Sequence, residues 1–342
     1  MKVIQVVSSN IPIQETGERK WGALELIQRE YQKNLHKMGI ECEIKWLNEV
    51  EYAPDTIVHI HVANLCLEAK QRGIPYIYSN HDHTSVHLGK GSWLYKQQLE
   101  AIKGSVFSIA HGESVLDFFG ETDKLFYLPH GVDTSYYLPS PSNIRNNSLL
   151  MVASNGMAGD YGIDRKGFRL GIEAAKKLDL PITIVGSEAN AKFFEIHSDL
   201  LNYQKLTIDS SNPKESDKLK YFQSHRLFLH PSYLEFGSPC LTLLEARSCA
   251  LPMVAAYDGS MKIDGLNKID RLDVDDICSR IQYTLDNYEA FVYIMRQNRE
   301  KHDWSNITKQ LHKMYQAALD VRKFEDTPTV QKRYIETYAK RD

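Results

Sequence analysis

The sequence has no run of about 18 apolar residues, the minimum length for a helix that crosses a membrane. The apolar stretch that begins at Met1 is too short for a secretory signal peptide. The five cysteines are scattered without paired spacing, which predicts buried free thiols in a reducing compartment rather than disulfides. These absences argue against an integral membrane protein and a disulfide-stapled secreted domain, and they predict a cytoplasmic location.

The sequence also lacks an excess of charge of either sign. Its 41 Lys and Arg residues are nearly balanced by 44 Asp and Glu residues, which gives a net charge of −3. Bulk charge therefore gives no support for strong nonspecific binding to nucleic acid or to an anionic membrane, although a local basic groove remains compatible with it. What is present is an ordinary globular composition and, at 342 residues, a length that favours two domains.

Predicted strands and helices alternate along most of the chain, which indicates an α/β fold of parallel sheets covered on both faces. A first series occupies residues 1–138 and a second occupies residues 148–322, joined by a Pro-, Ser- and Asn-rich linker at 139–147. The predicted strands are Val3–Ser8, Glu41–Trp46, Thr56–His61, Pro75–Ser79, Ser105–Ala110 and Lys124–Leu128, then Leu149–Ala153, Ile182–Val185, Leu206–Ile208, Leu227–Leu229 and Met253–Ala256.

Helical patterns fill most segments between these strands. A helix is predicted at Trp21–Met38 with Gly39 ending it, and others near 168–178, 214–224 and 240–250. Two more, near 287–300 and 304–323, are expected to pack on the second sheet, and residues 323–342 to form a helix that returns toward the first domain. Ligands bind at the carboxyl ends of strands in open parallel sheets, so polar residues just after strands are the candidates for a site.

The stretch 230–256 indicates strand, loop, helix and strand in that order. Ser238 is predicted to cap the helix and Pro239 to be its first residue. The free backbone N–H groups of Cys240, Leu241 and Thr242 would then form an anion site suited to a diphosphate.

Two glutamates flank this helix start, Glu235 on the loop and Glu245 within the helix. With their flanking segments they resemble the signature of the large family of retaining glycosyltransferases with the GT-B fold, two Rossmann-like domains that face a central cleft. The resemblance implies that Glu235 and the backbone after it, at Gly237 and Ser238, hold donor-sugar hydroxyls and that Glu245 holds the nucleotide ribose. The glutamates are separated by two residues more than is normal in the family. The alternative is a pair of carboxylates on the protein surface.

A basic pair, Arg165 and Lys166, precedes Gly167 where the second domain's first helix is predicted to begin. The family has a Lys before a Gly in this place and an Arg five residues earlier, where this chain has Tyr161. The resemblance implies that Lys166, with Arg165 in place of the usual Arg, neutralises the donor diphosphate. The alternative is a solvated pair at a helix start.

Two further marks agree with this family, and one loop departs from it. Gly186 ends the strand Ile182–Val185, as in the nucleotide-binding half of the family, and segment 128–133 resembles its turn before the second domain. In the loop Gln14–Gly22 the usual paired glycines are absent, but Gly22 is expected to let the backbone approach the donor.

A histidine-rich segment, His81-Asp82-His83, follows a strand of the first half. The family commonly places a His, often followed by Asp, beside the reacting sugar, which implies that His81 or Asp82 positions the acceptor hydroxyl or accepts its proton. The triplet is also similar to the DNA α-glucosyltransferases of T-even bacteriophages. This similarity makes a hydroxymethylated pyrimidine in phage DNA one candidate acceptor, in which case the protein would act in DNA modification in the host cytoplasm. A bacterial surface glycan or a lipid-linked sugar is the other candidate.

Two patterns could indicate metals. A zinc site of His59, His61, His81 and His83 is conceivable, but hydrogen-bonded histidines at strand ends are the simpler interpretation. The acidic run Asp273–Asp276 resembles a metal motif of the other major glycosyltransferase fold, but it precedes a helix, where Asp is the expected cap. We therefore expect no cofactor and no essential metal.

Taken together, the motifs predict a glycosyltransferase that moves a sugar from a nucleotide-sugar, by default a UDP-sugar, with retention of configuration. A sugar-nucleotide epimerase of the same architecture, or a noncatalytic sugar- or nucleic-acid-binding protein, are the alternatives of other classes. The sugar, the nucleotide and the oligomeric state stay open at this point.

Overall fold

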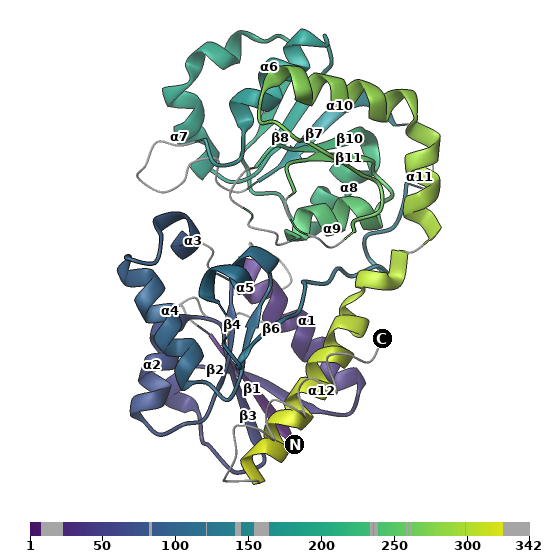
Figure 1. The fold of residues 1–342 in the computed structure, drawn as a ribbon. Coiled ribbons are helices and arrows are strands. Elements are labelled where there is room, and N and C mark those ends of the chain that lie inside the picture. The colour runs from purple at the N-terminus through teal and green to yellow at the C-terminus, as the bar shows by residue number, and fades with distance from the viewer. Residues whose placement is uncertain are drawn as a thin grey trace. The chain divides into compact units, whose positions relative to one another are not determined.

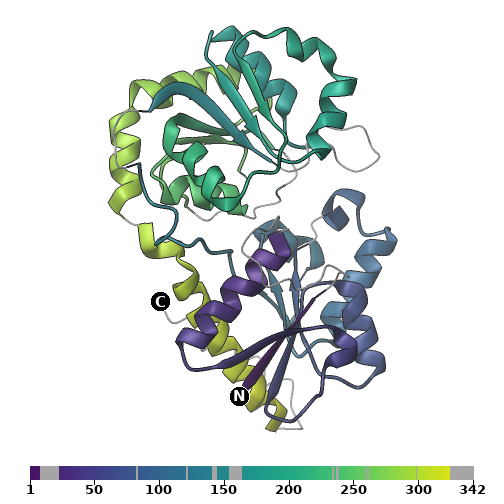
Figure 2. The ribbon, with the colours of Figure 1, turned by 180° about the vertical axis from the view of Figure 1, so that it is seen from behind.

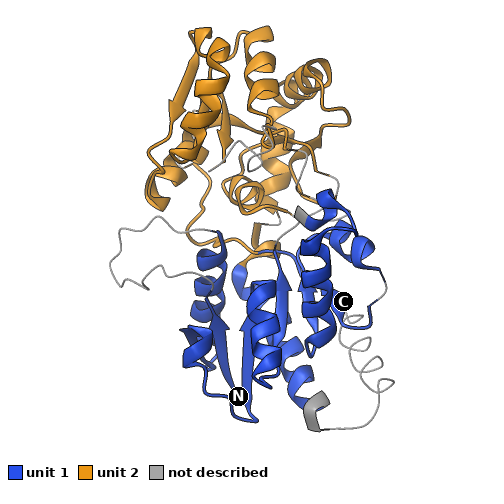
Figure 3. Ribbon diagram, turned by 90° about the vertical axis from the view of Figure 1, so that its left-hand side faces the viewer, with its two compact units in different colours: residues 1–15, 21–130, 304–342 blue, residues 16–20, 131–303 orange. Residues whose placement is uncertain are grey.

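The computed structural model describes residues 1–7, 23–81, 84–120, 122–140, 145–153, 164–232, 235, 239–257, 259, 262–297 and 299–323. These residues form two compact units (Figure 3). Unit 1 holds the described residues up to His130 and those from Trp304 onward, and unit 2 holds those from Gly131 to Asp303. Each unit contains a six-stranded parallel sheet, so the predicted α/β architecture is confirmed.

The sheet of unit 1 has the strand order β2-β1-β3-β4-β5-β6 (Figure 1). Its direction of progression reverses between β1 and β3, and the carboxyl end of such a switch point is where α/β sheets bind ligands. The strands are β1 (Lys2–Val6), β2 (Glu41–Lys45), β3 (Thr56–Ile60), β4 (Ile77–Asn80), β5 (Ser108–Ala110) and β6 (Leu125–Tyr127).

Helices cover both faces of this sheet. Side chains alternate along each strand, so Val58 and Ile60 of β3 enter one core while His59 points to the opposite face. Gly39 ends α1 in the left-handed conformation, as predicted. The helices are α1 (Ala23–Lys37), α2 (Ala63–Gln71), α3 (Thr84–Leu88), α4 (Trp93–Gly104), α5 (Glu113–Phe119) and α12 (Trp304–Lys323), with a 3₁₀ turn, η1 (Leu47–Glu49).

Helix α12 packs on unit 1, beside α1 (Figures 1 and 2). The Trp304 and Tyr31 rings meet edge to face at 5.4 Å, and the Tyr315 hydroxyl is hydrogen-bonded to Gln5 and His59. From sequence this helix was expected on the second sheet, inside a domain ending at 322. Periodicity reveals an apolar helix face but not the sheet that buries it, which explains the difference.

The boundary between the units also differs from the predicted one. Residues 131–138, placed in the first domain from sequence, lie in unit 2 because Val132 and Tyr137 are buried in its core. The Ser248 hydroxyl donates to the Tyr137 carbonyl at 2.7 Å. Residues 324–342, with the predicted returning helix, lie outside the described residues.

The sheet of unit 2 has the order β12-β11-β10-β7-β8-β9, with its switch point between β7 and β10. Edge strand β12 was not predicted, because three residues are too few to show a period-two pattern. The strands are β7 (Asn146–Val152), β8 (Ile182–Val185), β9 (Leu206–Asp209), β10 (His225–His230), β11 (Met253–Ala255) and β12 (Leu266–Lys268).

The helices of unit 2 enclose two cores, one on each face of the sheet. Leu149 and Met151 of β7 pack in one core and Leu150 and Val152 in the other, as strand alternation requires. The helices are α6 (Phe168–Lys177), α7 (Ala189–Ile196), α8 (Glu215–Ser224), α9 (Leu241–Ser248), α10 (Val274–Asp286) and α11 (Tyr288–Gln297), with 3₁₀ turns η3 (Ser198–Asn202) and η4 (Arg299–His302). Within the described part of the chain, no helix is long and apolar enough to cross a membrane.

The acidic run before α10 has structural partners. Asp273 caps the helix by accepting a hydrogen bond from the Asp276 amide at 2.8 Å, as predicted. Asp275 pairs with Lys177, and Asp276 accepts the amides of Asp270 and Arg271.

Candidate functional site

Two of the predicted donor residues, Lys166 and Glu235, meet at the carboxyl end of β10, beside the switch point of the unit 2 sheet. Lys166 Nζ lies 2.5 Å from Glu235 Oε1, and the two side chains are only 14% and 8% exposed. Burial opposes ionisation of Glu235, but Lys166 and His230 hold the pKa of its carboxyl well below the usual range. Glu235 is therefore an ionised, buried carboxylate, and the alternative of a surface position for it is wrong.

The loop before α6 is held against the end of β10. Gly167 has a φ of +69°, and a Cβ added there would lie 2.6 Å from the Pro231 carbonyl oxygen. The Ser232 hydroxyl is 3.1 Å from the Arg165 carbonyl oxygen and 2.6 Å from Glu235 Oε1. A glycine after Lys166 thus permits the close backbone approach that brings the ammonium to the carboxylate.

Arg165 directly precedes Lys166 in the loop before α6. Its Nε is buried and has no hydrogen-bond partner among the described residues. A buried donor without a partner is costly, and an anion such as a phosphate would satisfy it.

Helix α9 begins at Leu241, with Cys240 as its N-cap. The expected start at Pro239 is therefore two residues too early, and Ser238 and Gly237 lie outside the described residues. The Cys240 side chain does not cap the helix. The amides of Leu241 and Thr242, its first two residues, have no partner within the helix, whereas the Leu243 amide donates to the Cys240 carbonyl at 3.1 Å. Anion binding by the Leu241 and Thr242 amides stays a prediction.

Glu245 of α9 is 2% exposed, so the surface alternative is wrong for this residue as well. Its Oε1 accepts from Lys218 Nζ at 2.9 Å, and Lys218 also lies 3.0 Å from Glu215. Burial raises the pKa of Glu245, and the Lys218 ammonium opposes that rise. Its second oxygen, Oε2, is buried and has no hydrogen-bond partner among the described residues, because the neighbouring Tyr137 hydroxyl donates to Glu215. This oxygen can therefore accept a ligand hydroxyl.

Sequence reasoning missed Lys218, although a signal was present. A carboxylate inside the apolar stretch Leu241–Ala246 is predicted to be buried, and a buried carboxylate requires a cation. Which cation meets it depends on the packing of α8 against α9, which the sequence does not display.

Gly186 lies where three segments converge. A Cβ added there would be 2.0 Å from the Ala153 carbonyl oxygen and 2.2 Å from the Asn190 side chain. The Gly186 amide donates to the backbone carbonyl of Asp209 at 2.8 Å, and the Gly186 carbonyl accepts a hydrogen bond from the Asn212 amide at 2.7 Å. Only a glycine fits this position at the end of β8.

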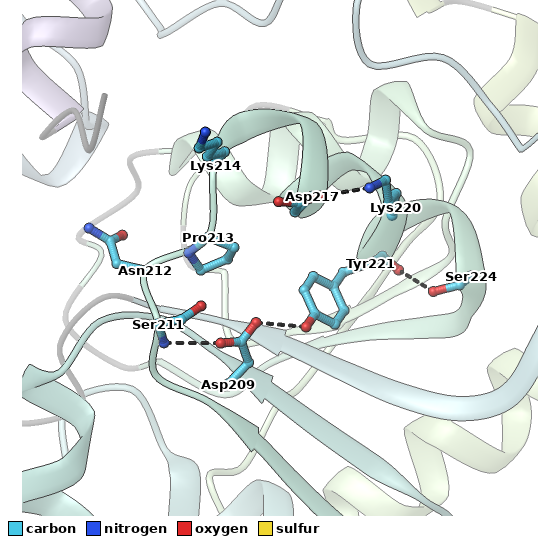
Figure 4. Close-up of a pocket in the computed structure, with 9 residues that line it drawn as sticks. All are labelled: Asp209, Ser211, Asn212, Pro213, Lys214, Asp217, Lys220, Tyr221 and Ser224. Atoms are coloured by element: carbon cyan, nitrogen blue, oxygen red, sulfur yellow. Dashed lines mark hydrogen bonds and ion pairs between the residues drawn. The ribbon is translucent and has the colours of Figure 1, made fainter. Parts of the chain in front are cut away.

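A hollow of about 570 Å³ opens beside Gly186, at the carboxyl end of β9 (Figure 4). Within it, Asp209 accepts hydrogen bonds from the Ser211 amide and the Tyr221 hydroxyl. The residues that line the hollow are Asp209, Ser211, Asn212, Pro213, Lys214, Asp217, Lys220, Tyr221 and Ser224.

In unit 1, His81 belongs to a chain of hydrogen-bonded side chains that begins at Tyr315. Gln5 Nε2 donates to the Tyr315 hydroxyl, so Gln5 Oε1 accepts from His61 Nε2 at 2.6 Å. His61 Nδ1 is then an acceptor for His81 Nε2, 2.8 Å away. Burial and neighbouring histidines hold the pKa of His81 well below its usual range, so the ring is neutral and its proton is on Nε2. The remaining nitrogen, Nδ1, is buried, carries a lone pair and has no hydrogen-bond partner among the described residues.

The histidines considered for zinc are otherwise engaged. His59 bonds to Tyr315 through Nδ1 and to Ser79 through Nε2, and both nitrogens of His61 are also bonded. They are the hydrogen-bonded strand-end histidines of the simpler interpretation. His83, Asp82 and Gly22 lie outside the described residues.

His230, which sequence reasoning did not select, joins the Glu235 site. Its Nε2 lies 3.4 Å from Glu235 Oε1 and 3.5 Å from Cys240 Sγ. Burial opposes its protonation, but Cys240 and Glu235 raise the pKa of His230 to about 9. Its position at the end of a predicted strand was the sequence signal that could have identified His230 as a site residue.

Residues 162–265 match the family model of glycosyl transferases group 1, a range that includes Lys166, Glu235 and Glu245. Among curated proteins, no sequence matches the chain.

Several solved structures are similar to this chain at low sequence identity. HepE of Anabaena in complex with UDP-glucose has a TM-score of 0.67 at 16% identity, covering 93% of this chain and 100% of that one. WaaG, involved in lipopolysaccharide biosynthesis, has a TM-score of 0.61 at 14% identity, covering 92% and 99%. Trehalose-6-phosphate synthase, studied for glycosyl transfer with retention, has a TM-score of 0.62 at 11% identity, covering 86% and 80%.

These matches confirm the predicted GT-B fold. The match to the glycosyl transferases group 1 model, together with this fold, confirms the prediction that the protein is a glycosyltransferase.

Proposed function

We propose that this protein transfers a sugar from a UDP-sugar to an acceptor hydroxyl with retention of configuration. The observation that carries the proposal is the buried ion pair of Lys166 and Glu235 at the carboxyl end of β10, next to the start of α9. A cation, a carboxylate and free helix amides at one point suit a diphosphate joined to a sugar. The similar structures solved with UDP and UDP-glucose, and the one studied for transfer with retention, support the donor and the stereochemistry.

In this proposal the donor binds to unit 2. Its diphosphate lies against Lys166, Arg165 and the first amides of α9, and its ribose hydroxyl donates to Glu245 Oε2. Phosphate binding draws the Lys166 ammonium away from Glu235, which frees that carboxylate to accept hydroxyls of the sugar. The cations neutralise the charge that builds on the departing nucleotide, so no metal is needed for that task.

In this proposal the acceptor hydroxyl binds at His81 and Asp82 of unit 1. Neutral His81 with an unprotonated Nδ1 is in the protonation state that a hydrogen-bond acceptor or general base requires. Gln5 and His61 keep that tautomer by fixing the proton on Nε2.

Two acceptors are compared, each with its own support. The His81-Asp82-His83 triplet favours hydroxymethylated pyrimidine in DNA. Similarity to WaaG, a protein of lipopolysaccharide biosynthesis, favours a glycan or lipid-linked sugar.

The test is nucleotide release from UDP- and GDP-sugars, with and without DNA containing hydroxymethylcytosine and with and without a lipopolysaccharide-type glycan. We expect UDP release only when an acceptor gains the mass of one sugar. Interconversion of the donor without acceptor would identify an epimerase, and donor binding without any turnover would identify a binding protein; either result would overturn the proposal. The anomeric configuration of the product, determined by NMR, tests retention.

A further inference from the structure

Three neighbouring strands of the unit 1 sheet each lead into a histidine. β4 ends at Asn80 and β5 at Ala110, which are register partners, so His81 and His111 follow at matching positions. His130 follows β6, the next strand of the sheet. Parallel strands end at the same edge of a sheet, and one ring nitrogen of each histidine lies within 4.8 Å of the other two.

The three rings stack instead of converging on a common point. The centroid of the His111 ring lies 4.2 Å from that of His81 and 4.2 Å from that of His130, with the planes within 19° of parallel. The His81 and His130 rings are 5.4 Å apart and within 4° of parallel. A metal ion bound by a ring nitrogen lies in the plane of that ring, and rings stacked in this way share no such point. The arrangement therefore fixes the orientation of the rings and does not suit a shared ion.

His111 is the anchored member of this cluster. Its ring is buried, and its Nδ1 donates a hydrogen bond to the Leu128 carbonyl oxygen at 2.7 Å. The Leu128 amide in turn donates to the Ala110 carbonyl oxygen at 3.0 Å, which continues the ladder between β5 and β6. The His111 ring is thus tied to the backbone of the sheet, and it forms a fixed surface for the ring of His81.

The ring of His81 has fewer constraints of its own. Its Nε2 donates to His61 Nδ1 at 2.8 Å, and its Nδ1 has no hydrogen-bond partner among the described residues. A single hydrogen bond fixes the position of one nitrogen but leaves the ring able to tilt about that contact. The Nδ1 lone pair lies in the ring plane, so a tilt changes the direction from which a hydroxyl can donate to it. Stacking on His111 removes this freedom, because it fixes the plane of the ring as well.

We propose that His111 is a positioning residue: it holds the plane of the His81 ring so that Nε2 donates to His61 and Nδ1 accepts the hydrogen of the acceptor hydroxyl. The inference rests on the proposed function, in which His81 receives that hydroxyl. His111 acts through the His81 ring and touches no substrate itself. Its effect is on kcat, because a general base contributes its typical factor of about 10²–10⁴ only when it is in line with the proton that it accepts.

Two substitutions separate the stacked ring from the hydrogen bond that anchors it. His111→Asn keeps a side-chain donor for Leu128 but removes the ring, and His111→Phe keeps a flat ring but removes the donor. We expect His111→Asn to lower kcat at least about 10-fold at saturating donor and acceptor, which is part of the contribution of the base. His111→Phe should retain most of the wild-type kcat. UDP affinity should stay unchanged in both variants, and the control His36→Asn, which alters a histidine bonded to Cys42 outside the stack, should behave as wild type.

Nitrogen NMR of the histidine-labelled, substrate-free chain provides a readout that needs no activity. The His81 signals are identified by their loss in His81→Asn. In the wild-type chain and in His111→Phe we expect a single form of His81 with its proton on Nε2. In folded His111→Asn, checked by circular dichroism, we expect the proton to be shared between both ring nitrogens, because the ring is no longer held against His61.

Three results would overturn the proposal. The first is a wild-type chain in which the proton of His81 is on Nδ1 or shared between the two nitrogens, a result that requires no variant to fold. The second is a folded His111→Asn chain with wild-type kcat and a single form of His81. The third is a folded His111→Phe chain that loses as much kcat as His111→Asn. If the spectra are as expected but the wild-type chain transfers no sugar, the proposed function fails while the orientation of His81 by His111 stands.

Discussion

Lys166 Nζ and Glu235 Oε1 lie 2.5 Å apart although the residues are 69 positions apart in the sequence. Two loops at the carboxyl end of the unit 2 sheet bring them together. The pair joins both halves of the proposed donor site, the diphosphate cation and the sugar-binding carboxylate, so its integrity is the first property to test.

Lys166→Ala should lower kcat/KM for the donor by about 10²–10³-fold, the loss typical when one electrostatic donor to a transition state is removed. It should also destabilise unit 2 by about 3–5 kcal/mol, because Glu235 loses its partner while buried. Steady-state turnover and urea denaturation measure the two effects. Lys177→Ala is the matched control, since Lys177 is 56% exposed and pairs with Asp275 at the surface. Equal activity of the two variants would refute the assigned site.

Gly167→Ala should displace Lys166. The substitution meets both the left-handed φ of +69° and a contact of 2.6 Å with the Pro231 carbonyl oxygen. Gly39→Ala separates the two costs, because Gly39 has a φ of +75° but open space around it. We expect Gly39→Ala to cost about 1–2 kcal/mol and keep full activity, as backbone strain alone predicts. Gly167→Ala should cost more in chemical denaturation and lose transfer activity; an active Gly167→Ala chain would mean that the close approach is not needed.

Glu245→Gln should weaken donor binding by about 10–100-fold, the range expected for losing a hydrogen bond to a charged group, about 1.5–3 kcal/mol. The substitution keeps the shape of the side chain but leaves Lys218 with Glu215 as its remaining partner. Calorimetry with UDP provides the measurement, and Glu289→Gln on the exposed surface of α11 is the control. Undiminished UDP affinity in Glu245→Gln would remove this residue from the ribose site.

Acid should destabilise unit 1 through its buried histidines. Burial lowers the pKa of His59 to about 3 and holds those of His61 and His81 well below the usual range. Below about pH 6.5 the unfolded chain binds protons that the folded chain does not, so stability falls as pH falls, by about 1.4 kcal/mol per pH unit for each such histidine. Urea midpoints between pH 7.5 and pH 5 should show this slope, and His59→Gln should make it shallower. A flat profile would mean that these rings take up protons in the folded state.

Tyr315→Phe should loosen α12 from unit 1. The hydroxyl of Tyr315 bonds to Gln5 and His59, and its loss leaves a buried histidine nitrogen without its partner, at a cost of about 1–3 kcal/mol. Hydrogen exchange of α12 amides should quicken relative to wild type. Tyr283→Phe is the control, since Tyr283 is 58% exposed. If exchange quickened equally in both variants, the Tyr315 contacts would not be what holds the helix.

Much of the fold could be predicted because its signals are local. Period-two and helical patterns located each strand of unit 1 to within three residues at either end, and Asp273 was identified as a helix cap from its neighbours alone. Strand β12 escaped because three residues show no pattern. The start of α9 was misplaced because Ser and Pro are general helix-start residues, whereas the observed cap, Cys240, carries no such signal.

The sequence by itself determined the alternation of strands and helices, the glycines at 167 and 186, and the types of charged residue at the strand ends. Periodicity, capping and glycine conformation depend on neighbours within a few positions, so they can be read directly. Only the tertiary structure decided that Lys166 meets Glu235, that Lys218 meets Glu245, and that α12 packs on unit 1. Ion pairing and burial depend on which distant segments pack together, and that choice rests on many weak contacts across the whole chain.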